Sequence, residues 1–151
     1  MSVNIRKATV EDLPAIRNLV KELAIYERAE IELTASIEEY ISSFNSGWFE
    51  SQVAENEEGI IGMILYYETF STWKGKMLYL EDFYVKPKFR GQNIGQQLFV
   101  TFLKTARHKG CKLTKWQVLD WNDPAVKFYE KNKATIEKEW WNGKIIFDQT
   151  N

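Results

Sequence analysis

The sequence predicts an α/β fold in which helices cover a central sheet. Segments with strand periodicity and segments with helix periodicity follow one another in the order β-α-α-β-β-β-α-β-α-β-β, a mixed order typical of this class. The chain has 151 residues, of which 44% are apolar and 27% charged. A chain of this length can bury a hydrophobic core, and this proportion of apolar residues argues against disorder. We therefore expect a single domain over residues 1–151.

The first half of the chain predicts a strand, two helices and a hairpin. Residues 3–8 alternate like a short strand, and Thr9 followed by Asp12 resembles the cap of a helix. This helix is expected to run to about Tyr26, and a second helix to start at Thr34. The apolar side chains of the second helix share one face: Ile37, Tyr40, Ile41 and Phe44. The hairpin strands are expected at residues 48–55 and 60–70.

The second half adds a long strand, a helix, another strand, a short helix and a final hairpin. Pro87 ends the long strand at 77–85, because proline has no N–H for a sheet. Asn122 with Pro124 predicts the start of the short helix, and Asn142-Gly143 predicts a type I′ turn. The other elements are expected as a helix at 94–109, a strand at 112–120 and hairpin strands at 136–141 and 144–148.

Charge is divided along the chain, although the net charge is only −1. The stretch from Glu22 to Glu58 has ten acidic residues and one basic residue, whereas the stretch from Lys86 to Lys115 has eight basic residues and no acid. One half should therefore attract cations and the other anions, unless these are two solvated faces that happen to segregate. A nucleic-acid binder would carry an overall basic excess, which this chain lacks.

The rarest residue types exclude several kinds of site. Cys111 is the one cysteine and His108 the one histidine, which excludes an internal disulfide, a cysteine-based zinc cluster and a His-rich metal site. No apolar run approaches the ~20 residues of a membrane span, and residues 1–10 lack the apolar core of a signal peptide. We therefore expect a cytoplasmic protein with no metal, membrane or nucleic-acid partner.

The most informative segment is Arg90-Gly91-Gln92-Asn93-Ile94-Gly95. It lies between a predicted strand and a predicted helix, where backbone N–H groups can converge on an anion. The fingerprint of dinucleotide-binding folds is absent, and so is the Gly-Lys-Ser/Thr of a P-loop. The sequence therefore predicts a phosphate-binding loop of another type, the alternative being a solvated turn that caps the helix.

This loop resembles the Arg/Gln-x-x-Gly-x-Gly/Ala loop of the GNAT family of N-acetyltransferases, which grips the pyrophosphate of acetyl-CoA. Asn122-Asp123-Pro124-Ala125 followed by Phe128-Tyr129 resembles the next cofactor helix of that family. Within the family the chain is most similar to the diamine acetyltransferases, which are the spermidine/spermine and thialysine N-acetyltransferases. The segments that carry this similarity are 21–27, 73–83 and Trp121-Asn122.

The resemblance implies the GNAT fold, with a mixed, mostly antiparallel sheet and helices on both faces. It also implies acetyl-CoA as co-substrate and a homodimer. The implied cofactor-binding residues are Phe83, Tyr84, Val85, Arg90, Gly91, Gln92, Asn93, Ile94, Gly95, Gln96, Asn122, Asp123, Pro124, Ala125 and Tyr129. The implied substrate-binding residues are Tyr26, Glu27, Trp73, Glu81 and Asp82.

Acetyl transfer to an amine needs a base, because an alkylammonium has a pKa of about 10 and is no nucleophile while protonated. Glu81 is the candidate base, acting directly or through water, and Tyr129 is the candidate acid for the leaving thiolate. Neighbours in a strand face opposite sides, so only a bulge or splay would bring Glu81 and Asp82 to one site. The alternatives are a solvent-facing and a salt-bridged carboxylate in the strand, a packed tyrosine at 129, and an exposed helix end at Glu27.

Three positions depart from the pattern of the family. Asn93 and Lys133 stand where glycine is usual, and Ile25 stands where spermidine/spermine enzymes have lysine. Asparagine tolerates left-handed backbone better than most residues, so the loop is still expected to form.

The expected activity is acetylation of a primary amine on a small cationic substrate, such as a polyamine, a diamine or a thialysine-like amino acid. The acidic first half favours cationic substrates. A protein or peptide N-acetyltransferase is one alternative, and a non-catalytic acyl-CoA-binding module is another. The presence of both Glu81 and Tyr129 argues against the module.

Overall fold

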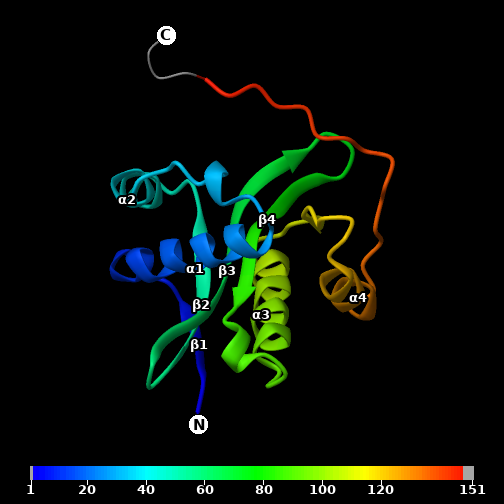
Figure 1. The fold of residues 1–151 in the computed structure, drawn as a ribbon. Helices are drawn as coiled ribbons and strands as arrows, with labels where there is room; N and C mark the ends of the chain where they lie inside the picture. Colours follow the sequence, from blue (N-terminus) through cyan, green and yellow to red (C-terminus); the bar gives the residue numbers. More distant parts are fainter. Residues whose placement is uncertain (1, 148–151) are drawn as a thin grey trace. The chain divides into compact units, whose positions relative to one another are not determined.

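A computed structural model describes residues 2–147 of the chain (Figure 1). The chain divides into two compact units, of which the first ends at Gln117 and the second begins at Val118. The first unit contains a five-stranded sheet and the helices α1, α2 and α3. The described part of the second contains one helix, α4 (Asp123–Lys131). Among residues 2–147, no helix is both long enough and apolar enough to cross a membrane.

The sheet has the strand order β1-β2-β3-β4-β5, which is also the order along the chain. The first four strands pair antiparallel and β5 pairs parallel with β4. The sheet is therefore mixed and mostly antiparallel, as predicted. The strands are β1 (Asn4–Lys7), β2 (Glu50–Asn56), β3 (Gly59–Ser71), β4 (Gly75–Val85) and β5 (Leu113–Lys115).

Alternation along β3 distributes its side chains to two helical layers. Met63 and Leu65 belong to the core cluster that includes three buried leucine and isoleucine side chains of α1 (Leu13–Tyr26). Tyr66 points the other way and packs against Phe102 of α3 (Ile94–His108), with ring centroids 5.5 Å apart. Helices thus cover both faces of the sheet, and α2 (Ile37–Asn45) joins the α1 side.

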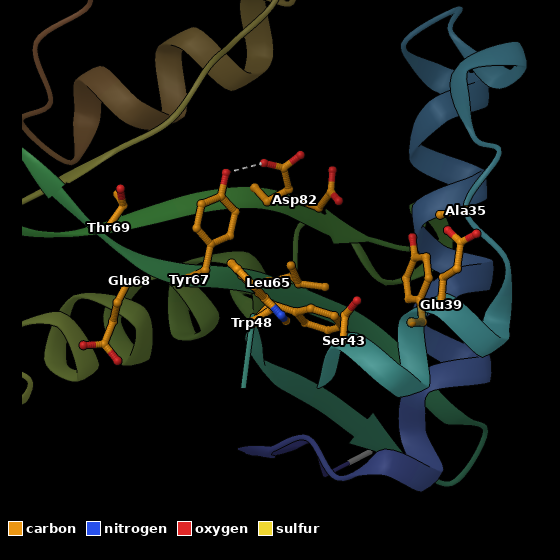
Figure 2. Close-up of a pocket in the computed structure, with 12 residues that line it drawn as sticks. Ala35, Glu39, Ser43, Trp48, Leu65, Tyr67, Glu68, Thr69 and Asp82 are labelled. Atoms are coloured by element: carbon orange, nitrogen blue, oxygen red, sulfur yellow. Dashed lines mark hydrogen bonds between the residues drawn. The ribbon is translucent and has the colours of Figure 1, made fainter. Parts of the chain in front are cut away.

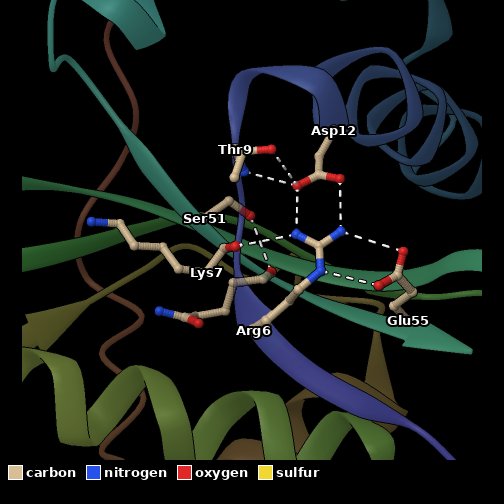
Figure 3. A network of polar contacts seen from close by, with 7 residues as sticks. Arg6, Lys7, Thr9, Asp12, Ser51 and Glu55 are labelled. Atoms are coloured by element: carbon tan, nitrogen blue, oxygen red, sulfur yellow. Dashed lines mark hydrogen bonds and ion pairs between the residues drawn. The ribbon is translucent and has the colours of Figure 1, made fainter.

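A polar network ties β1 to the start of α1 and to β2 (Figure 3). The Arg6 guanidinium donates to both carboxylate oxygens of Asp12, at 2.7 and 2.9 Å, and its Nε donates to Glu55 Oε1 at 3.1 Å. The Asp12 carboxylate also accepts from the backbone N–H of Thr9 at 2.8 Å, which forms the expected cap. The Arg6 side chain, followed by the Thr9 N–H, lowers the pKa of Asp12 against the opposing effect of burial.

Asp12→Asn is expected to destabilise the fold by about 1.5–3 kcal/mol at pH 7, because it removes charged hydrogen-bond partners from a nearly buried site. A carboxylate with a lowered folded-state pKa contributes stability above its unfolded pKa of about 4 and loses it as pH falls. The gap between wild type and variant should therefore shrink below pH ~4. Urea denaturation at several pH values measures this, and a gap that stays constant with pH would refute the ionic origin of the effect.

The prediction for the start of the second helix is off by three residues. The helix begins at Ile37 rather than Thr34, because Ser36 is its N-cap and the Ser36 hydroxyl accepts from the backbone N–H of Glu39 at 3.1 Å. Ile37 and Ile41 pack on the core as expected, but Tyr40 of the same predicted face is directed elsewhere.

Two strand predictions are corrected. The strand expected at 112–120 covers only Leu113–Lys115. Its pairing with β4 ends at Tyr79, just before an irregularity in β4, and such an irregularity bends a strand away from its neighbour.

The final hairpin expected at 136–141 and 144–148 is absent from the described residues up to 147, and Asp148 lies outside them. A lone two-stranded hairpin is marginal in water unless it packs on something. The apolar side chains that would anchor it are exposed, with Trp141 94% and Phe147 88% accessible.

Candidate active site

A β-bulge in β4 determines how the two acidic residues of this strand are placed. Leu65 pairs with Asp82 and the next residue, Tyr66, pairs with Leu80, so Glu81 is an extra residue in β4. The register places Asp82 on the same face as Leu65, which is the face covered by α1 and α2. Since Glu81 is inserted at the irregularity, both carboxylates reach that face. The strand therefore contains the bulge that the sequence analysis required for Glu81 and Asp82 to share one site.

Glu81 and Asp82 line one pocket between α2 and the strands β3 and β4 (Figure 2). Its volume is about 620 Å³. No Lys, Arg or His is among its lining residues. These are Ala35, Glu39, Tyr40, Ser43, Trp48, Phe49, Leu65, Tyr67, Glu68, Thr69, Glu81 and Asp82. The pocket is thus aromatic and acidic, which suits an organic cation.

Asp82 lies in the most unusual electrostatic environment of the pocket. Burial, reinforced by the negative charges of Glu81 and Glu27, raises the pKa of Asp82 to about 7. Burial also raises the pKa of Glu27 at the end of α1. From α2, the Tyr40 hydroxyl has its pKa raised by burial and then by the charge of Asp82. Asp82 is therefore a carboxyl group that changes charge near neutral pH.

Glu81 is exposed and is held by a tyrosine. The Tyr67 hydroxyl donates to Glu81 Oε1 at 3.0 Å, and Figure 2 draws this bond as the dashed line that starts at the Tyr67 hydroxyl. Tyr67 is itself stacked on Tyr79, with ring centroids 5.4 Å apart. Burial and the Glu81 carboxylate raise the pKa of Tyr67, so its hydroxyl remains a donor. The two neighbouring carboxyls thus differ: Glu81 is exposed and oriented by Tyr67, whereas Asp82 is half-buried and has a raised pKa.

The segment predicted to bind phosphate has the backbone shape of an anion nest. Gly91 and Asn93 both have left-handed backbone, with φ of 77° and 66°. Asn93 is the N-cap of α3, which confirms the expectation that asparagine accepts the position of the usual glycine. Within residues 2–147, no backbone N–H from Gly91 to Gly95 donates to another protein group. These N–H groups at a helix N-terminus are available to an anion.

Arg90 lies at the start of this loop but is already engaged. Its Nε donates to the Val85 carbonyl at 2.8 Å, and its guanidinium lies 5.1 Å from the Tyr84 ring centroid and 5.7 Å from that of Tyr26. Tyr26, which was predicted to bind substrate, contacts Arg90 at the start of this loop and is not among the residues that line the acidic pocket. This contact joins the end of α1 to the start of the loop at residues 90–95.

Among the other predicted residues of the first unit, Trp73, Phe83 and Val85 lie on or beside β4, whereas Gln96 lies in the first turn of α3. Trp73 is at the tip of the β3–β4 hairpin, 82% exposed, and does not line the pocket. Phe83 stacks on Phe99 of α3, and Val85 is buried. Because β5 pairs only as far as Tyr79, the segment 80–85 of β4 has no strand on its β5 side among the described residues. An extended ligand can pair with such an open edge.

The second unit carries the remaining predicted cofactor residues. The Asn122 side chain caps α4 by accepting from the Ala125 N–H, with Pro124 in the first turn, as predicted. Tyr129 is buried and contacts Phe128 edge-on. Lys133 adopts a left-handed φ of 68° after the helix, in the position where glycine is usual. Its N–H donates to the Glu130 carbonyl at 2.9 Å, which helps to end the helix despite the strained backbone.

Sequence reasoning missed the α2 side of the pocket. Glu39 and Tyr40 lie on α2, and Phe49 packs edge-on against Tyr40 with centroids 6.1 Å apart. The helical spacing of Tyr40 assigned it to the core. The sequence signal that could have indicated this wall was Tyr40 directly after the solvent-facing Glu39 on an amphipathic helix.

Comparison with known proteins identifies the family. The acetyltransferase (GNAT) family model matches residues 13–133. The thialysine N-epsilon-acetyltransferase of Bos taurus is 37% identical over 153 residues, which cover 93% of this chain and 89% of that protein. The human spermidine/spermine N(1)-acetyltransferase-like protein 1 is 32% identical, over 90% of this chain and 21% of its own length.

Solved structures with the same fold include acetyltransferases at low sequence identity. An aminoglycoside acetyltransferase from an uncultured soil metagenomic sample, in complex with trehalose, superposes with a TM-score of 0.80 at 21% identity, covering 97% of each chain. An aminoglycoside N-acetyltransferase in complex with CoA superposes with a TM-score of 0.76 at 17% identity, covering 95% of each chain. The chain belongs to the GNAT acetyltransferase family and is an acetyl-CoA-dependent N-acetyltransferase.

Proposed function

We propose that this enzyme transfers the acetyl group to a primary amine of a small cationic substrate, such as a polyamine, a diamine or a thialysine-like amino acid. The observation that carries the proposal is the bulge that places the Glu81 and Asp82 carboxylates in one aromatic pocket without a lining cation. Carboxylates attract an ammonium group and aromatic faces add cation–π attraction. The similarity to thialysine acetyltransferases supports the same substrate class.

The carboxylate pair supplies the base that the reaction needs. The ammonium gives up a proton, and the amine lone pair then forms a bond to the thioester carbonyl carbon. The tetrahedral adduct collapses with cleavage of the C–S bond, and its nitrogen gives up a second proton, so that the products are the neutral amide and a thiolate that takes up a proton to become the free thiol. The sequence assigned the base to Glu81. We propose Asp82 as the proton acceptor instead, because burial and neighbouring charges raise its pKa to about 7, which is better matched to neutral pH. Glu81, which Tyr67 orients, would then bind the ammonium.

For the cofactor, we propose that the N–H groups of Gly91 to Gly95 bind the pyrophosphate of acetyl-CoA. The pantetheine chain would run along the open edge of β4 at Phe83, Tyr84 and Val85, where backbone groups can pair with its amides. Gln96 and the start of α4 complete the proposed cofactor set.

For the thiolate, we propose Tyr129 as the acid, on the resemblance of the α4 segment to the cofactor helix of the family. The family match over residues 13–133 includes parts of both units. This supports a single N-acetyltransferase domain for the whole chain.

A panel of acceptors tests the proposed reaction. Release of free CoA should be fast with diamines, polyamines and thialysine, and near background with uncharged amine analogues, with peptides or without acceptor. Peptides that outcompete every small amine would favour the protein N-acetyltransferase alternative. Release with no acceptor in the panel, together with tight acetyl-CoA binding, would favour the non-catalytic acyl-CoA-binding module.

We also propose that the enzyme is a homodimer. Exposed apolar side chains between residues 140 and 147 support this, because they favour burial against a partner. Light scattering at micromolar concentration should give twice the 17.8 kDa of one chain. A mass near that of one chain would contradict the dimer.

A further inference from the structure

Glu39 is a pocket carboxylate whose side chain has no protein partner within residues 2–147. It lies in the first turn of α2, and its backbone N–H is occupied by the Ser36 cap. Among the described residues, no Lys or Arg forms an ion pair with its side chain and no donor bonds to it. It is exposed and lines the pocket, as Figure 2 shows.

The other pocket carboxylates are accounted for. Glu68 pairs with Lys76 at 2.7 Å and with Lys109 at 3.4 Å, so its charge is neutralised. Glu81 and Asp82 form the proposed amine-binding pair on β4. Glu39 is therefore the pocket charge that remains, and it comes from the opposite wall, on α2.

Aromatic side chains line the pocket together with Glu39 on α2 and the Glu81 and Asp82 pair on β4. Phe49 is fixed edge-on by Tyr40 and by Phe44, at centroid distances of 6.1 and 5.6 Å. Trp48 is a further lining side chain. Methylene groups pack favourably on such surfaces, and a pocket of about 620 Å³ exceeds what a short monoamine fills.

We propose that Glu39 binds a second positive charge of the acceptor, on the group that is not acetylated. It thereby makes the enzyme selective for acceptors with two cationic groups over monoamines of the same length. This inference rests on the proposed function, since it assigns one wall of the same pocket.

The test compares 1,5-diaminopentane with n-pentylamine, which has the same chain but lacks the second charge. Glu39→Gln should lower kcat/KM for the diamine about 2- to 5-fold, the size expected of an exposed ion pair, and leave that for pentylamine unchanged. Glu39→Lys should lower kcat/KM for the diamine further and leave kcat/KM for pentylamine unchanged. Both effects should shrink as salt is raised.

Glu38→Gln is the matched control, because Glu38 is also exposed in the first turn of α2 and does not line the pocket. It should behave like wild type with both amines. If Glu39→Gln and Glu39→Lys keep the wild-type ratio between the two amines, the role of Glu39 is refuted while the proposed function stands. If wild type acetylates neither amine, the proposed function itself fails.

Discussion

Asp82→Asn should lower kcat by about 10²–10⁴-fold, because it removes the group that accepts the amine proton. In the wild type, kcat/KM should rise with pH through about 7 and then level, since the buried carboxyl must be ionised to act as a base. Glu81→Gln should instead move this rise to lower pH, because it removes one of the negative charges that keep the pKa of Asp82 high. The measurement is a pH profile of both kcat and kcat/KM for each enzyme, from rates over a range of diamine concentrations at each pH.

The control is Glu57→Gln, which removes a carboxylate in the β2–β3 turn, outside the pocket. It should reproduce the wild-type profile. If Asp82→Asn retains the wild-type rate while Glu81→Gln is inactive, the base is Glu81, as the sequence alone suggested.

The thermal stability of the folded protein gives a second measure of the electrostatic environment of Asp82. A carboxyl whose folded-state pKa is raised from about 4 contributes stability at low pH and loses it as pH rises through about 7. Asp82→Asn should therefore unfold at a higher temperature than wild type at pH 8, and the difference should vanish near pH 4. A variant that is inactive but more stable has lost chemistry rather than its fold.

We propose that the guanidinium of Arg90 also binds a phosphate of CoA, as the family resemblance of the loop implies. Arg90→Glu should therefore raise the Kd for CoA by about 10- to 100-fold, because it removes charged hydrogen bonds to phosphate and adds a repulsive charge. It would also release the contacts with Tyr26 and Tyr84 beside the loop. Calorimetric titration with CoA measures the change, and raised salt should weaken binding to the wild type.

Lys88→Glu is the matched control for this charge reversal. Lys88 lies two residues before Arg90, and its side chain pairs with Glu58 at 3.0 Å. It should change the affinity for CoA far less. Equal losses in both variants would indicate a general charge effect, and no loss in Arg90→Glu would remove this arginine from the cofactor site.

Local chemistry explains which parts of the fold were predictable. The caps at Thr9 and Asn122 and the left-handed Asn93 depend on a few neighbouring residues, so the sequence defined them. The start of α2 was missed because Ser36 competes with Thr34 as the cap. The strand at 112–120 was overestimated because its length depends on where β4 bends.

The site was predictable only in part, because its decisive feature is the register in which β4 pairs with β3. Glu81 and Asp82 could be singled out as acids within a strand, but their convergence depends on how β4 pairs with β3. Tyr26 contacts Arg90, a pairing between distant segments that sequence spacing cannot reveal. The missing final hairpin shows the same limit, since an exposed hairpin needs a surface on which to pack.

A crystal structure of the wild-type enzyme with CoA and 1,5-diaminopentane tests the central claim most directly. The account predicts one amine nitrogen within about 3 Å of the Glu81 or Asp82 carboxylate, and the CoA pyrophosphate on the N–H groups of Gly91 to Gly95. A diamine bound outside the pocket lined by Tyr40 and Tyr67, with both carboxylates facing only water, would contradict it.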